Sequence, residues 1–146
     1  MDINFTQEQF KTLLKLIYMG HWMLTAHDDK PDKVIDALTS HIYSFAKSSG
    51  VNTLVELDPD NGRFYGTRQF EELMSEYIDD YDNQTFWDEL IERLANRDFL
   101  AKYGEEAIQK MSMEERFTNF QEFEDRYGEE FEDHGIERIA ISDSKT

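Results

Sequence analysis

The chain has no cysteine, two prolines and no long apolar run. Without cysteine there are no disulfides, thiolate zinc ligands or cysteine nucleophile, and the chain suits a reducing compartment. The longest apolar stretch, residues 13–26, is interrupted by Lys15 and His21 and is too short to span a bilayer. The first ten residues, MDINFTQEQF, lack the cationic start and apolar run of a signal peptide. We therefore expect a cytoplasmic protein with no membrane segment.

Basic residues are also scarce, and the shortage is uneven. The chain has 15 Lys and Arg against 32 Asp and Glu, for a net charge of −17. Residues 1–55 carry six acidic and five basic residues, whereas residues 56–146 carry 26 and 10. Such a field repels nucleic-acid phosphates and anionic lipids and attracts basic proteins or cations. We expect no direct nucleic-acid binding and no membrane partner.

Aromatic residues are plentiful, at 14% of the 146 residues, and they supply material for a hydrophobic core. A chain of this length is close to the commonest size of one domain. It contains no internal repeat and no low-complexity linker. These features predict a single globular domain over residues 1–141 and a flexible tail over residues 142–146.

The first 50 residues predict two helices. Thr6 and Gln9 have the spacing of a capping box, and Phe5 and Phe10 that of a hydrophobic staple, so the first helix starts there and runs to about Ala26. Because it is apolar on most sides, we expect it to be the buried central element or part of an oligomer interface. The second helix starts at Pro31 and ends before the glycine at position 50, and we expect the two to pair antiparallel.

Residues 51–66 break the helical period. Two short strand candidates, residues 54–57 and 63–65, flank the turn sequence DPDNG and predict a small hairpin. The segment IERIAI at residues 136–141 is the other strand candidate and is expected to add a third strand. Calcium binding by DPDNG is disfavoured, because the glycine comes one residue early and the twelfth loop position is Gln69.

Further helices are predicted beyond the hairpin. The third starts at Thr67 and ends in the acidic IDDYDN, the fourth starts at Thr85, and short helical segments follow Asp98. Ser112 and Glu115 then form a second capping box, which opens a long helix ending at the glycine of position 135. The fold class is therefore α+β and predominantly α, with five or six helices around the N-terminal helix and a two- or three-stranded antiparallel sheet.

The long C-terminal helix has two opposite faces. At about 100° per residue, its aromatic residues gather within a third of the circumference, and we expect this stripe to pack on the first helix. They are Phe117, Phe120, Phe123, Tyr127 and Phe131. Acidic residues occupy the opposite face. Those expected to bind a partner are Glu122, Asp125, Glu129, Glu132 and Asp133, together with Glu76, Asp79 and Asp80 of the third helix.

An acidic helix face has two interpretations, a solvated surface or a docking surface for a basic protein. Successive carboxylates lie roughly 5 to 6 Å apart along one face, comparable to the phosphates of one DNA strand. A DNA mimic or inhibitor that occupies a cationic groove is therefore a specific form of the docking hypothesis. The interspersed Arg116, Arg126 and Arg138 count against it.

No pattern of catalytic residues emerges. The chain has no G-x-S-x-G elbow, P-loop or G-x-G-x-x-G. His21 and His27 do not share a helix face, and His21 is expected to be a core or boundary histidine with one nitrogen bonded. Glu130 and His134 are four residues apart but lack the partner motif of a dinuclear site. We expect no catalytic residue, metal or cofactor.

Three segments resemble an uncharacterised family of small acidic bacterial proteins. They are TRQFEELM, YDNQTFWDELIERLANRD and KYGEEAIQKMSMEERF. The resemblance covers most of the chain and implies a bacterial cytoplasmic origin, but it transfers no site residues.

Two alternatives to docking on a basic protein stay open. One is a small-molecule or enzymatic site lined by aromatic residues, between His21 and Trp22 of the first helix and the helix that carries Trp87. The other is a structural homodimer formed through the apolar first helix.

Overall fold

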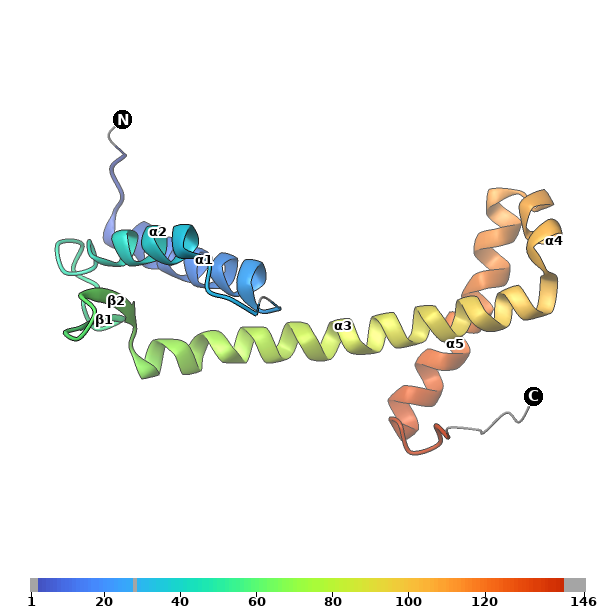
Figure 1. Ribbon diagram of the computed structural model, residues 1–146. Helices are drawn as coiled ribbons and strands as arrows, with labels where there is room; N and C mark the ends of the chain where they lie inside the picture. Colours follow the sequence, from blue (N-terminus) through green and yellow to red (C-terminus); the bar gives the residue numbers. More distant parts are fainter. Residues whose placement is uncertain (1–2, 28, 141–146) are drawn as a thin grey trace. The chain divides into compact units, whose positions relative to one another are not determined.

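The computed structural model describes residues 3–27 and 29–140 (Figure 1). These residues form five helices and a two-stranded antiparallel sheet, so the predicted α+β and predominantly α fold is confirmed. Contacts divide the chain into two compact units, Met1–Asp79 and Asp80–Thr146. The single domain over residues 1–141 stays a prediction, and the tail at 142–146 lies outside the described residues.

The first unit begins with two helices, α1 (Gln7–Thr25) and α2 (Lys33–Tyr43). The capping box of Thr6 and Gln9 is present, and the rings of Phe5 and Phe10 lie 6.4 Å apart, which confirms the start of α1. The start of α2 differs slightly from the prediction. Asp32 is the N-cap, with its carboxylate accepting from the backbone of the next turn, so Pro31 precedes the cap instead of opening the helix.

A hairpin of β1 (Val55–Asp58) and β2 (Arg63–Gly66) follows, with Val55 opposite Gly66. The predicted plain turn is confirmed between the strands. The Asp58 carboxylate accepts from the backbone N–H of Asp60, and Gly62 adopts a φ of +68°, which side chains rarely tolerate.

The core of the first unit lies among α1, α2, the hairpin and the start of α3. It contains Phe10, Leu14, Tyr43, Ala46, Val51, Val55, Phe70 and Met74. Phe10 and Leu14 are the buried residues of α1, whereas Leu16 and Leu24 are 65% and 64% exposed. The first helix is thus buried along one side and not all round, because its neighbours in this unit pack against that side.

The helix α3 (Arg68–Tyr103) runs without a break through the region where two helices were predicted. That prediction is wrong at the acidic segment IDDYDN. Asp and Asn favour turns, but no Gly or Pro interrupts residues 67–103, so their exposed side chains stay compatible with a helix. Gly104, with a φ of +73°, ends α3.

The second unit contains the later part of α3, α4 (Glu105–Lys110) and α5 (Met113–His134). The capping box of Ser112 and Glu115 is confirmed. The aromatic stripe of α5 is core, as predicted, but the partner differs: Phe120 and Phe123 pack edge-on against Phe99 of α3, where the first helix was expected. Phe117 is 68% exposed and lies outside this core.

The predicted third strand is wrong over its described part. Residues 136–138 form turns and residues 139–140 have no regular structure, with the backbone N–H of Ile139 bonded to the carbonyl of Ile136, and residue 141 is not described. Gly135 leaves α5 with a φ of +55°, and the side chains of Ile136 and Ile139 are exposed. An alternating apolar pattern does not make a strand where no edge pairs with it.

Candidate functional site

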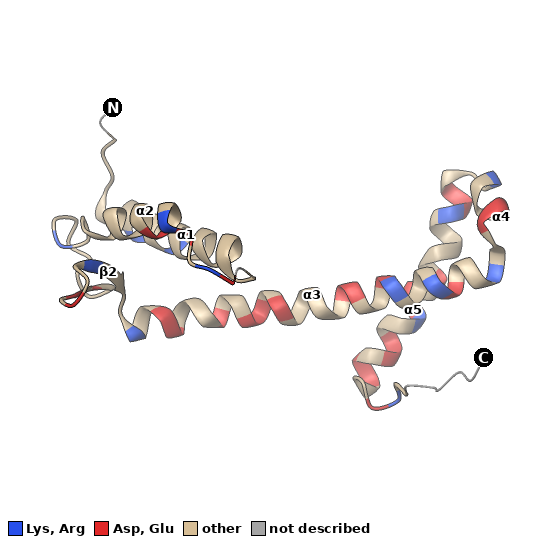
Figure 2. Cartoon of the chain, in the orientation of Figure 1, with Lys and Arg blue, Asp and Glu red and all other residues tan. Residues whose placement is uncertain are grey.

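The predicted acidic residues of α5 are all exposed. We call Glu122, Asp125, Glu129, Glu132 and Asp133 the acidic side of α5. None of the five forms an ion pair with any residue that the structure describes. Figure 2 shows acidic residues recurring along α5 and along α3. Five uncompensated carboxylates therefore point to solvent from one side of a helix.

The arginines that weakened the docking hypothesis are directed elsewhere. Arg126 bonds to the carboxylate of Asp98 on α3 at 2.6 Å and lies over the ring of Tyr127. Arg138 pairs with Glu130 at 3.2 Å. At about 100° per residue, Arg116 falls on the aromatic side of α5. These arginines consequently leave the charge of the acidic side largely uncompensated.

Repulsion among carboxylates is present in the second unit itself. The pKa of Glu124 is raised by burial, and secondly by the charges of Glu92 and Asp125. A half-buried carboxylate held near two others opposes folding at neutral pH. The neighbouring carboxylates therefore add to the cost that burial imposes on Glu124.

The three predicted acids of α3 are exposed, but they divide between the units. Glu76 and Asp79 belong to the first unit and Asp80 opens the second. None of them forms an ion pair within the described part of the chain.

A second candidate site, which the sequence anticipated only in part, is a cavity of about 370 Å³ in the first unit. One face of α1 and one face of α2 line it, each with side chains at positions i, i+3, i+4 and i+7. These are Tyr18, His21, Trp22 and Thr25 from α1, and Asp36, Thr39, Ser40 and Tyr43 from α2. Strand β2, residues 63–66, and Glu71 of α3 complete the wall.

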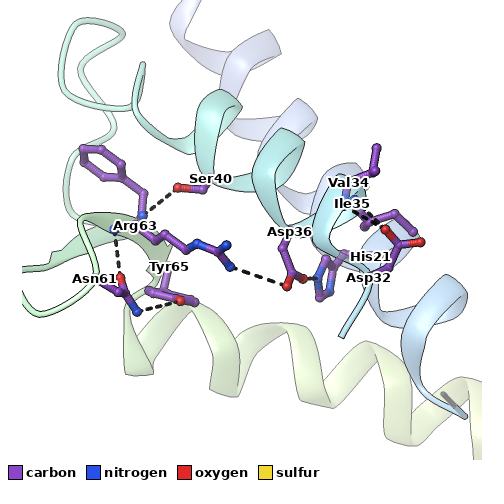
Figure 3. A network of polar contacts seen from close by, with 10 residues as sticks. His21, Asp32, Val34, Ile35, Asp36, Ser40, Asn61, Arg63 and Tyr65 are labelled. Carbon is purple, nitrogen blue, oxygen red and sulfur yellow. Dashed lines mark hydrogen bonds and ion pairs between the residues drawn. The ribbon is translucent and has the colours of Figure 1, made fainter. Parts of the chain in front are cut away.

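An ion-paired network crosses this cavity wall (Figure 3). The Nε2 atom of His21 lies 3.0 Å from Oδ1 of Asp36, and Nη1 of Arg63 lies 3.5 Å from Oδ2 of the same carboxylate. The backbone N–H of Phe64 donates to Oγ of Ser40 and ties β2 to α2. His21 is thus a boundary histidine with one nitrogen bonded, as predicted.

The same face of α2 carries a polar atom without a partner. Tyr43 is 2% exposed, and its hydroxyl has no hydrogen-bond partner among the described residues. Burial raises the pKa of Tyr43 strongly, and the neighbouring Tyr18 and Glu71 raise it further. Burial and the Glu71 carboxylate likewise raise the pKa of Tyr18. Tyr18, Tyr43 and Glu71 all line the cavity.

The alternative of an aromatic-lined site between the first helix and the helix that carries Trp87 stays a prediction, because the cavity has other walls. His21 and Trp22 line it, but Trp87 belongs to the second unit, where its ring lies 5.7 Å from that of Phe131. Sequence reasoning missed Asp36, Tyr43 and Glu71. The available signal was the shared helical spacing of polar and aromatic residues on α1 and α2.

Metal ligation finds no support in the described part of the chain. No three His, Asp or Glu side chains within residues 3–27 and 29–140 gather as metal ligands would. Glu130, four residues before His134, pairs instead with Arg138. Within the same residues, no helix combines the length and apolar character needed to cross a bilayer.

Searches against models of known protein families, curated proteins and solved structures found no match to this chain. Its function is therefore inferred from the geometry of its own residues.

Proposed function

We propose that this protein acts by binding a basic protein through the acidic side of α5, and that it catalyses no reaction. The observation that carries the proposal is a difference in ion pairing between the acidic residues of α5 and the arginines near them. The five acids of this side have no ion-pair partner among the described residues, whereas Arg126 and Arg138 are paired within the second unit. A partner with Lys and Arg side chains would supply the missing countercharge.

A cationic DNA-binding groove is the specific partner surface that we propose. The acidic side of α5 offers carboxylates roughly 5 to 6 Å apart, a spacing that phosphates of one DNA strand also approach. A partner held this way would release the protein when duplex DNA is added. We also propose the cytoplasm as the compartment, since a chain without cysteine is compatible with a reducing environment.

The proposal is tested by capture of partners from a bacterial lysate on the immobilised protein. A four-site variant, Glu122→Gln, Asp125→Asn, Glu129→Gln and Glu132→Gln, removes four charges from the acidic side of α5. The proposal predicts that basic proteins held by the wild type are lost from this variant, and that salt elutes them from the wild type.

A matched control removes four charges elsewhere. Glu8, Glu56, Glu105 and Glu106 are exposed and form no ion pair with a described residue. Their replacement by Gln gives the same net charge as the α5 variant and should leave capture intact. Capture that resists high salt, or equal loss in both variants, would reject docking on α5.

Self-association is a second candidate, favoured by apolar side chains that the first unit leaves exposed. On α1 these are Leu16, Met23 and Leu24, at positions i, i+7 and i+8, and on α2 they are Val34 and Leu38. A second copy of the chain would cover them. Light scattering should then give a dimer that Leu24→Glu dissociates. A monomer at every concentration would exclude it.

A further inference from the structure

The residues that line the cavity of the first unit include an unpaired charge and a hydroxyl without a hydrogen-bond partner. Two carboxylates, Asp36 and Glu71, line it with one arginine. Asp36 is shared by His21 and Arg63, but Glu71 has no ion-pair partner among the described residues. The unpaired charge among the lining residues is therefore negative, and it belongs to Glu71, which is also exposed to solvent.

The hydroxyl of Tyr43 supplies an independent indication of a ligand. A buried hydroxyl without a partner is destabilising, and such groups are uncommon in folded proteins. Tyr43 is one of the residues that line a cavity large enough for a small organic molecule. A ligand N–H that reaches this hydroxyl would give its oxygen a hydrogen bond.

The other lining residues indicate the chemical character of the main part of the ligand, which we call its body. Trp22, Phe64 and the ring of Tyr18 provide apolar and aromatic surface. Aromatic faces favour cations as well as apolar groups. An anion would meet two carboxylates and find one guanidinium, which Asp36 already engages.

We propose that this cavity binds a small primary amine in its protonated form, with an apolar or aromatic body. The ammonium group donates hydrogen bonds to the Glu71 carboxylate and to the hydroxyl oxygen of Tyr43, and the body packs against Trp22 and Phe64. A quaternary ammonium fits less well, because it has no N–H to donate to Tyr43. This function is separate from docking through α5.

Three probes of similar shape test the charge preference: phenethylamine, 2-phenylethanol and phenylacetate. Each is titrated into the full-length protein while the indole N–H signals of the two tryptophans are followed by NMR. Trp22 lines the cavity, and Trp87 lies in the other unit and serves as an internal control. Phenethylamine should shift the Trp22 signal, leave Trp87 unchanged and bind roughly tenfold more tightly than the alcohol.

Variants locate the binding groups. Glu71→Gln should weaken phenethylamine binding roughly tenfold, because it removes a charge-assisted hydrogen bond. Glu76→Gln is the matched control, since Glu76 is exposed on the same helix and does not line the cavity. Tyr43→Phe should weaken binding a few-fold and leave the fold intact, because the lost hydroxyl has no protein partner to release.

Three results would overturn the proposal. They are phenylacetate binding at least as tightly as the amine, equal effects of Glu71→Gln and Glu76→Gln, and no shift of Trp22 with any probe at millimolar concentration. None of them bears on the acidic side of α5.

Discussion

Asp98 shows how single residues hold the second unit together. Its carboxylate accepts hydrogen bonds from Arg97 on its own helix and from Arg126 and the Tyr127 hydroxyl on α5. These bonds, from Arg97 first, then Tyr127 and then Arg126, hold the pKa of Asp98 well below its usual range. The prediction that Asp98 starts a short segment is wrong, because α3 continues through it to Tyr103. No local pattern could show its role, since its partners on α5 lie 28 and 29 residues away.

Asp98→Asn should lower the free energy of unfolding at pH 7 by about 1 kcal/mol, a size appropriate to a partly exposed charged group. The folded-state pKa is depressed, so this stabilisation is present above the unfolded pKa of about 4 and is lost as the pH falls below it. Denaturant unfolding at neutral and acidic pH should therefore show a difference from wild type that shrinks in acid. Asp82→Asn, an exposed substitution on the same helix, should show almost none. A constant difference across pH would contradict the role of the charge.

At the scale of elements, the sequence predicted features whose causes are local. The starts of α1 and α5 follow from capping boxes four residues long, and the hairpin turn follows from DPDNG. The length of α3 and the turns at residues 136–138 were missed, because propensity alone does not say whether exposed Asp and Asn stay helical or whether a strand finds a partner. The cavity joins residues of four elements, which no local pattern connects.

The pairing of α5 with α3 is tested by two substitutions of the same chemistry. Phe120→Asp should destabilise the protein by several kcal/mol, because it places an unpaired charge against Phe99 in the core of the second unit. Phe117→Asp should change stability by less than about 0.5 kcal/mol, since that ring is exposed. Thermal unfolding compares the two variants. If the two variants were equally stable, the packing of Phe120 against Phe99 would be contradicted.

For the whole molecule, the net charge of −17 sets the mode of interaction that we propose. Excess charge keeps a protein dispersed but opposes its compact state through self-repulsion. A basic partner would relieve this repulsion on binding. The sequence alone shows that the two parts of the chain differ in charge. The ion pairs of Arg126 and Arg138 are seen only in the structure.

The most direct test of docking through α5 is the affinity of a captured partner for three proteins at several salt concentrations. These are the wild type, the four-site α5 variant and the matched control with the same net charge. The account predicts that affinity falls steeply with salt for wild type and control, and that the α5 variant binds at least about tenfold more weakly at low salt. Equal affinities and equal salt dependence for all three would contradict it.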